Sequence, residues 1–196
     1  MWLESLFLKR FSEGAKRPVS RPFPPYSYVP GAGWPHPKSN PNGHSYHIIE
    51  TKPLPIAPDS YWDSQEYRHA IALFNAGFYW EAHEVWEGLW HAAGRTGTVA
   101  SFLKALIKIA AAAVKLRECV EAGALTHASR ARLLLESLRQ ETGPDFLGQN
   151  LEDLILWCNE IQAGQFRQDQ ASRSLAVVVV YDRNLKSGPE RAPVEA

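Results

Sequence analysis

Apolar side chains recur with a helical period along most of the chain after residue 58. Tyr67, Ile71 and Phe74 are spaced one helical turn apart, and Asp59 or Ser60 is suited to cap the start of this first helix. Glycines separate the periodic segments and mark the helix ends. The pattern predicts five helices, over residues 59–77, 78–93, 98–121, 126–141 and 145–163.

The third predicted helix has the widest apolar face. Leu103, Leu106 and Ile107 share that face with Ala110 and Ala113, and the small side chains of the alanines at 110–113 let neighbouring helices approach closely. We therefore expect this helix at the centre of the domain. The connections between the helices are short, which favours antiparallel neighbours, so the predicted fold class is all-α: a compact antiparallel bundle or array of about five helices.

Proline dominates the segment before the helices. Eleven of the 14 prolines lie within residues 1–58, and proline removes a backbone donor and fixes φ, so this segment cannot be mostly helix or central strand. It also holds too many apolar side chains for a freely solvated linker, among them Tyr26, Tyr28 and Trp34. We expect an N-terminal amphipathic segment and a proline-rich arm over 1–58, laid on a helical domain at 59–164.

The tail contains a run of β-branched residues, LAVVVVYD at 175–182, which is typical of a strand. A single strand needs a partner, and the alternating segment HSYHIIET at 44–51 is the candidate. The sequence thus predicts a small two-stranded β ribbon between arm and tail. Residues 165–196 are expected to form this C-terminal strand and a disordered tail.

Length, charge and cysteine content narrow the class of protein. A chain of 196 residues suits one domain with appendages, and its 21 Lys and Arg balance 21 Asp and Glu, so neither nucleic acid nor an anionic membrane is a favoured partner. Cys119 and Cys158 form no CxxC pair, which argues against a cysteine zinc site and a disulfide framework. No stretch resembles a signal peptide or a membrane span, so we expect a soluble, cytoplasmic protein.

The stretch EAHEVWEGLW at 81–90 carries the candidate chemistry. On a helical wheel at about 100° per residue, His83 and Glu87 lie together at the end of an apolar arc that runs from Val85 through Trp86 to Trp90. Both are therefore expected to be at least half buried. The opposite side is expected to face water with four residues, Glu81, Glu84, Gly88 and His91.

A half-buried carboxylate at Glu87 needs compensation. Three partners are open: His83 as an imidazolium, a metal ion, or a lysine of the third helix, where Lys104, Lys108 and Lys115 form one stripe. On the alternative interpretation, His83 and Glu87 form a hydrogen bond that only fixes helix packing, and the lysine stripe is a solvated face.

A metal ion bound by His83 and Glu87 needs further ligands, because divalent first-row ions take at least three or four. The arm offers His36 and His44 as candidates, provided that it folds over the helices. Zinc, manganese or iron suits such nitrogen and oxygen donors, and Glu84 is the candidate general base. The sequence shows no nucleophile elbow, phosphate loop or cofactor fingerprint.

The segments FNAGFYWEAHEVWEGLW and FLKALIKIAAAAVKLR resemble the bacterial and archaeal family known as domain of unknown function 309. That family's hallmark is a His, three residues, a Glu, two residues and then Trp or Tyr, which His83, Glu87 and Trp90 match. The resemblance extends over residues 74–138. It implies a small all-helical bundle whose motif has been suggested to bind metal, without an established activity.

Two functions are compatible with these residues. The first is a protein with a metal or small-ligand site at His83, Glu84, Glu87 and Trp90, with metal-dependent hydrolysis as the candidate reaction. The second is a noncatalytic interaction module, in which His83 and Glu87 form a structural polar lock. In that case a tryptophan-rich surface and the amphipathic segment would engage a protein partner or a second copy, through Trp2, Leu3, Leu6 and Phe7.

Overall fold

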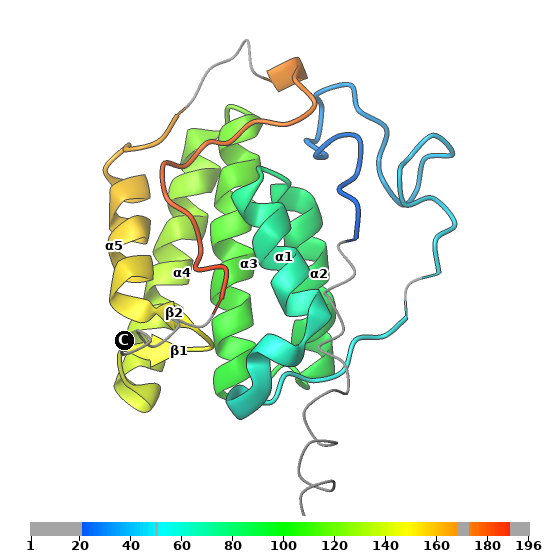
Figure 1. Ribbon diagram of the computed structural model, residues 1–196. Helices are drawn as coiled ribbons and strands as arrows, with labels where there is room; N and C mark the ends of the chain where they lie inside the picture. The colour runs from blue at the N-terminus through cyan, green and yellow to red at the C-terminus, as the bar shows by residue number, and fades with distance from the viewer. Residues whose placement is uncertain (1–20, 50, 168–172, 189–196) are drawn as a thin grey trace, which may run out of the picture.

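The computed structural model describes residues 21–49, 51–167 and 173–188 (Figure 1). Five α-helices form its body, and the all-α fold class is confirmed. The helices are α1 (Gln65–Asn75), α2 (Tyr79–Ala92), α3 (Gly97–Arg117), α4 (Glu121–Thr142) and α5 (Leu151–Gln162). A short 3-10 helix, η1 (Pro58–Asp63), precedes them, and the strands β1 (Asp145–Phe146) and β2 (Gln149–Asn150) lie between α4 and α5.

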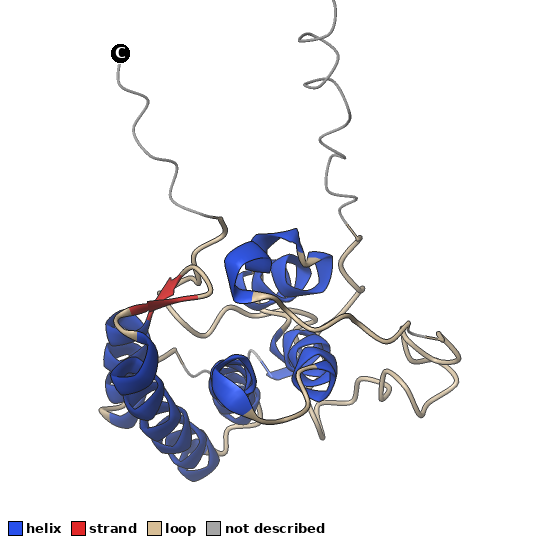
Figure 2. Ribbon diagram, turned by 90° about the horizontal axis from the view of Figure 1, so that it is seen from below, coloured by secondary structure: helices blue, strands red, loops and turns tan. Residues whose placement is uncertain are grey.

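Helix α3 lies at the centre of the domain, as its apolar face predicts. Each α-helix packs against the next one in the chain, so α3 has α2 on one side and α4 on the other (Figure 2). Phe102, Leu103 and Leu106 are almost fully buried, and Ala110, Ala112 and Ala113 expose none of their surface. The small alanine side chains bring the neighbouring helices close to the α3 backbone.

Two helix boundaries differ from the predicted ones, because a different residue caps α1 and a glycine predicted to end α3 lies inside α4. Ser64, and not Asp59 or Ser60, caps α1, because its hydroxyl accepts a hydrogen bond from Tyr67 N. Helix α3 ends at Arg117, and Gly123 lies inside α4 instead of closing α3. A Cβ at Gly123 would lie 3.0 Å from Lys115 Cδ, so the missing side chain lets α4 pack against this lysine.

The predicted start of the last helix at residue 145 is also wrong. Pro144 leads into the antiparallel pair β1–β2, in which Asp145 lies opposite Asn150. Asn150 then caps α5 by accepting a hydrogen bond of 3.0 Å from Asp153 N. A two-stranded ribbon is therefore present, but it lies between α4 and α5.

Residues 175–182 form no strand, and the predicted pairing with 44–51 is wrong. The tail instead crosses the helices as an extended segment, drawn in orange and red in Figure 1. Its Tyr181 ring fills the seam between α1 and α5, with centroids 6.1 Å from Phe74 and 5.0 Å from Trp157. The Val180 amide donates to Tyr79 Oη at 3.0 Å. Packing of Tyr181 on aromatic side chains and a hydrogen bond to a tyrosine hydroxyl thus hold this segment in place, without pairing to another strand.

The proline-rich arm lies along α1 and α2, on the right in Figure 1. Phe23 packs on Phe78, Tyr28 packs on Trp80, and Ile56 is buried in the core. One backbone hydrogen bond of 2.8 Å, from Ser27 N to Ala176 O, joins arm and tail. The amphipathic segment with Trp2, and the tail beyond residue 188, lie outside the described residues. None of the helices described is long and apolar enough to cross a membrane.

Candidate functional site

Helix α2 places the predicted motif between the core and the surface. Its buried residues Ala82, Trp86 and Leu89 face the other helices. His83, Glu84 and Glu87 are half-buried at the edge of that face, as the wheel predicts for His83 and Glu87. Gly77 sets the position of the helix, because its φ of 88° turns the chain between α1 and α2, and a Cβ there would lie 2.8 Å from Val178 O.

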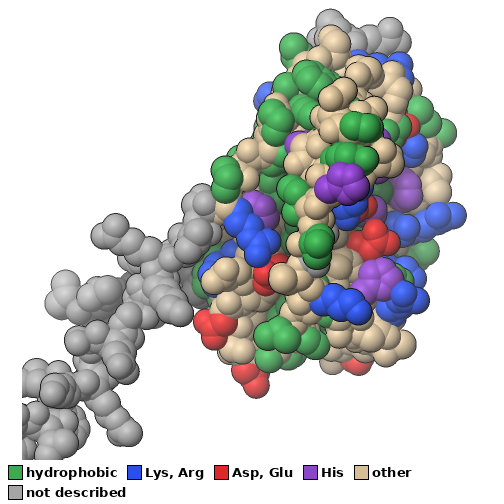
Figure 3. All heavy atoms as spheres, turned by 90° about the vertical axis from the view of Figure 1, so that its right-hand side faces the viewer, with side chains coloured by type: hydrophobic (Ala, Val, Ile, Leu, Met, Phe, Trp, Pro, Cys, Tyr) green, Lys and Arg blue, Asp and Glu red, His purple; other side chains and the backbone are tan. Residues whose placement is uncertain are grey.

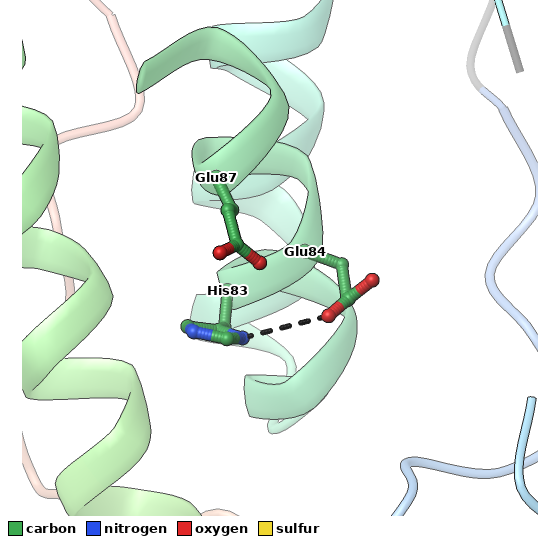
Figure 4. Close-up of side chains that lie close together, drawn as sticks. All are labelled: His83, Glu84 and Glu87. Atoms are coloured by element: carbon green, nitrogen blue, oxygen red, sulfur yellow. Dashed lines mark ion pairs between the residues drawn. The ribbon is translucent and has the colours of Figure 1, made fainter. Parts of the chain in front are cut away.

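Three potential metal-ligating side chains converge on this edge. One ligand atom from each of His83, Glu84 and Glu87 lies within 4.8 Å of the other two. Figure 4 shows Glu87 pointing back along α2 toward His83, while Glu84 approaches the imidazole from the other side. His83 Nδ1 lies 3.8 Å from Glu84 Oε1. Glu84, which the wheel placed on the water-facing side, is thus a member of the cluster.

Burial favours the neutral form of the His83 imidazole. Burial lowers the pKa of His83 below its ordinary value, and the positive charges of Lys108 and Lys38 lower it further. The carboxylates of Glu84 and Glu87 oppose this shift without reversing it. A neutral imidazole has a free nitrogen lone pair, which is the form that binds a metal ion.

The two carboxylates have different partners. Glu84 Oε2 pairs with Lys38 Nζ of the arm at 2.6 Å. Glu87 makes no ion pair with any residue that the structure describes, although Lys108 on α3 is near enough for Glu87 to influence its pKa. Of the three compensations considered for Glu87, direct pairing with His83 and direct pairing with a lysine are therefore both absent from the described chain.

Trp90 lies one turn beyond Glu87 and does not contact the cluster through a hydrogen bond. Its half-buried ring packs against His91, with centroids 5.1 Å apart, and the Arg95 guanidinium lies 5.4 Å from the ring. Trp86 is fully buried, and the arm covers Trp80 with Tyr28 and His36. These tryptophans pack against other side chains of the chain and do not form an exposed docking surface.

His36 and His44 do not join the cluster of His83, Glu84 and Glu87. The His36 ring packs on Trp80, and its Nδ1 accepts hydrogen bonds from the backbone amides of Lys38 and Ser39. His44 Nε2 lies 3.1 Å from Glu81 Oε1. The arm does fold over α2, but it brings these histidines to the turn before His83.

Glu81 is a polar residue that the helical wheel assigned wrongly. It is buried, with only 6% of its surface exposed, because the arm covers the side of α2 that would otherwise face water. Its Oε1 accepts hydrogen bonds from His44 Nε2 and the Tyr28 amide, while the buried Oε2 has no hydrogen-bond partner among the residues that the structure describes. Burial lowers the pKa of the Arg117 guanidinium, and the charge of Glu81 opposes this shift, so the two buried charges attract each other.

A cavity of about 590 Å³ lies between the arm and helices α1 and α2. Phe23, Trp80 and Val85 give it an apolar wall, and Glu81 and Glu84 line it on the α2 side. Figure 3 shows the corresponding face, where histidines lie among acidic and basic side chains. Because Glu84 belongs to both, the cluster borders a space large enough for a small molecule.

His127 of α4 also lies near the cluster, and sequence reasoning did not find it. Burial lowers its pKa to about 4, with further lowering by Lys108, Arg130, Lys115 and His83. Its Nδ1 is buried without a hydrogen-bond partner. Only the packing of α4 on α3 shows that His127 faces the lysine stripe, and no local pattern in α4 signals this.

Comparison with known proteins adds one match. Residues 67–129 match the family model described as Domain of unknown function (DUF309). The matched segment runs from α1 into α4 and includes the cluster, Lys108 and His127. The resemblance inferred from the motif is thereby confirmed. No curated protein matches the chain.

Proposed function

We propose that this chain, whose residues 67–129 match the family model of domain of unknown function 309, binds a divalent metal ion through His83, Glu84 and Glu87. The observation that carries the proposal is the convergence of three ligand atoms within 4.8 Å of one another. One neutral imidazole and two carboxylates form a donor set that suits zinc, manganese or iron.

The remaining features of the site support a metal-dependent hydrolase. Three protein ligands leave at least one coordination position for another molecule, as in catalytic metal sites. A divalent ion held there would act as a Lewis acid on an oxygen-containing substrate. The cavity beside Glu84 would hold an apolar part of that substrate against Trp80 and Val85. Lys38 fixes the orientation of the Glu84 carboxylate through their ion pair.

A structural polar lock is the second candidate, and the Lys38–Glu84 pair favours it. This pair already compensates Glu84 without a metal ion and ties the arm to α2. On this alternative, His83 and Glu87 would only complete the polar edge of the helix. The two candidates differ in what happens when a metal ion is offered.

The test is metal binding by the full chain, prepared without a chelator or a histidine tag. We expect stoichiometric zinc, manganese or iron by elemental analysis, and saturable binding of Zn²⁺ or Mn²⁺ by calorimetry. His83→Ala and Glu87→Gln should each raise the dissociation constant about tenfold or more, which corresponds to about 1.4 kcal/mol. His91→Ala is the matched control, because this exposed histidine lies on the same helix outside the cluster.

Absence of both stoichiometric metal and saturable binding would exclude the metal site. The polar lock would then predict that His83→Ala and Glu87→Gln each lower stability in metal-free buffer. Their effects should be non-additive, because a ligand atom of each side chain lies within 4.8 Å of the other and the Glu87 charge acts on His83.

A further inference from the structure

The surface strip of α3 next to the cluster carries positive charge that the described residues do not neutralise. Lys104 and Lys108 lie on this strip, and Arg130 faces it from α4. None of the three makes an ion pair in the described part of the chain. Of the two carboxylates in the cluster, only Glu87 lacks an ion pair within the described chain. Among the residues that the structure describes, three unpaired cations therefore lie near one unpaired carboxylate.

The helix packing explains why these charges meet. Lys115 of α3 packs on Gly123 of α4, where a Cβ would lie 3.0 Å from Lys115 Cδ. Two turns from this contact toward the N-terminus of α3 lies Lys108, and one and two turns toward the C-terminus of α4 lie His127 and Arg130. Because the two helices are antiparallel, these steps run the same way in space and bring the three residues to the same level. The other wall is α2 with His83 and Glu87. The charges on these residues influence one another, as the lowered pKa values of His83, Lys108 and His127 show.

His127 lies beside this strip and has a ring nitrogen that can donate a hydrogen bond to a ligand. Within the described chain, its buried Nδ1 has no hydrogen-bond partner. A buried N–H without an acceptor costs free energy, so the favoured tautomer carries its proton on Nε2. Burial, and after it the neighbouring cations, lower the pKa of the ring, so His127 is neutral and contributes a donor without adding another charge to the strip.

We propose that Lys108, Arg130 and His127 form a binding site for the oxyanion group of a small molecule, a phosphate or a carboxylate, beside His83 and Glu87. Lysine and arginine supply charge-assisted hydrogen bonds to such groups. The balanced charge of the whole chain, 21 basic against 21 acidic residues, favours a small anion over an extended polyanion. The role of this oxyanion as a substrate of the metal site rests on the proposed function. Its binding to Lys108 and Arg130 does not require the metal.

The test is titration of the full chain with inorganic phosphate, and in parallel with acetate, at constant ionic strength. Binding is followed by amide chemical shifts of α3 and α4, once with EDTA and once with saturating Zn²⁺ or Mn²⁺. We expect saturable shifts around Lys108 and His127. Lys108→Gln and Arg130→Gln should each weaken binding about tenfold. The anion that binds more tightly identifies phosphate or carboxylate as the ligand class.

Arg139→Gln is the matched control, because Arg139 lies on the same helix and pairs with Glu152, away from the strip. It removes one positive charge and should leave the phosphate affinity unchanged. An equal loss in this variant, or no saturable shift with either anion in either buffer, would overturn the inference. Anion binding without metal binding would instead remove the proposed hydrolase while leaving the anion site, and metal binding without anion binding would do the reverse.

Discussion

The backbone amide of Tyr28 donates a hydrogen bond of 2.9 Å to Glu81 Oε1, across 53 positions of the chain. This contact joins the arm to the first turn of α2, and His44 strengthens it by approaching the same oxygen. Glu81 therefore acts as the anchor of the arm. Its burial follows from the arm's position and makes α2 polar on a side that the solvent does not reach.

Glu81→Ala should release the arm from α2. It removes the acceptor of the Tyr28 amide, and we expect a loss of about 1–3 kcal/mol in the free energy of unfolding. Hydrogen exchange at the Tyr28 amide should accelerate in the same variant. Glu141→Ala, at an exposed position of α4, is the control. Unchanged protection of Tyr28 would show that Glu81 does not hold the arm.

Leu106→Ala should destabilise the domain strongly. Leu106 is almost fully buried on the central helix, and truncation of such a leucine costs about 2–5 kcal/mol. Urea unfolding measures the difference. Leu133→Ala removes the same atoms from a side chain that is 56% exposed, and should have only a small effect. Similar losses in both variants would place the core elsewhere.

The domain should lose stability above pH 10. Burial raises the pKa of Tyr79 to about 12. The unfolded chain therefore gives up this proton first, so the contribution is complete below pH 10 and is lost as the pH rises toward about 12. Tyr79→Phe should flatten the fall in unfolding free energy over this range. An identical slope in Tyr79→Phe and wild type would contradict the assignment.

The domain should also lose stability in mild acid through His127. Its pKa is lowered from 6.5 to about 4, so the unfolded state binds a proton at a pH where the folded state does not. The contribution is complete above pH 6.5 and is lost as the pH falls toward 4. His127→Gln should weaken this dependence in thermal melts at pH 4–7, whereas His91→Gln should retain it. Equal pH profiles for His127→Gln and wild type would show that another group titrates.

Local patterns predicted the helices well, because helical periodicity reports directly on which face is buried. Leu103, Leu106 and the alanines identify α3 as the centre before any coordinate is known. The helix ends are less well determined by sequence. Glycine is common at helix ends, yet Gly123 lies inside α4, where its missing side chain makes room for Lys115 of α3.

Only the part of the site that lies on a single helix, α2, could be predicted from the sequence. The spacing of His83 and Glu87 places them on one edge of α2, and the structure keeps them there. Glu81, Lys108 and His127 depend on the arm, α3 and α4, and their roles arise from contacts between segments far apart in sequence. The β-branched tail shows the same limit, because a strand propensity at Val180 does not reveal that Tyr79 will bind its amide.

The burial of Tyr181 and Leu185 has a consequence for synthesis on the ribosome. These side chains expose 4% and 3% of their surface, and Tyr181 packs against Phe74, more than 100 residues earlier in the chain. Helices α1 to α5 are therefore translated before the aromatic seam between α1 and α5 can be closed. Until residues 180–185 emerge, the nascent helices expose Phe74 and Trp157, a state open to chaperones and to aggregation.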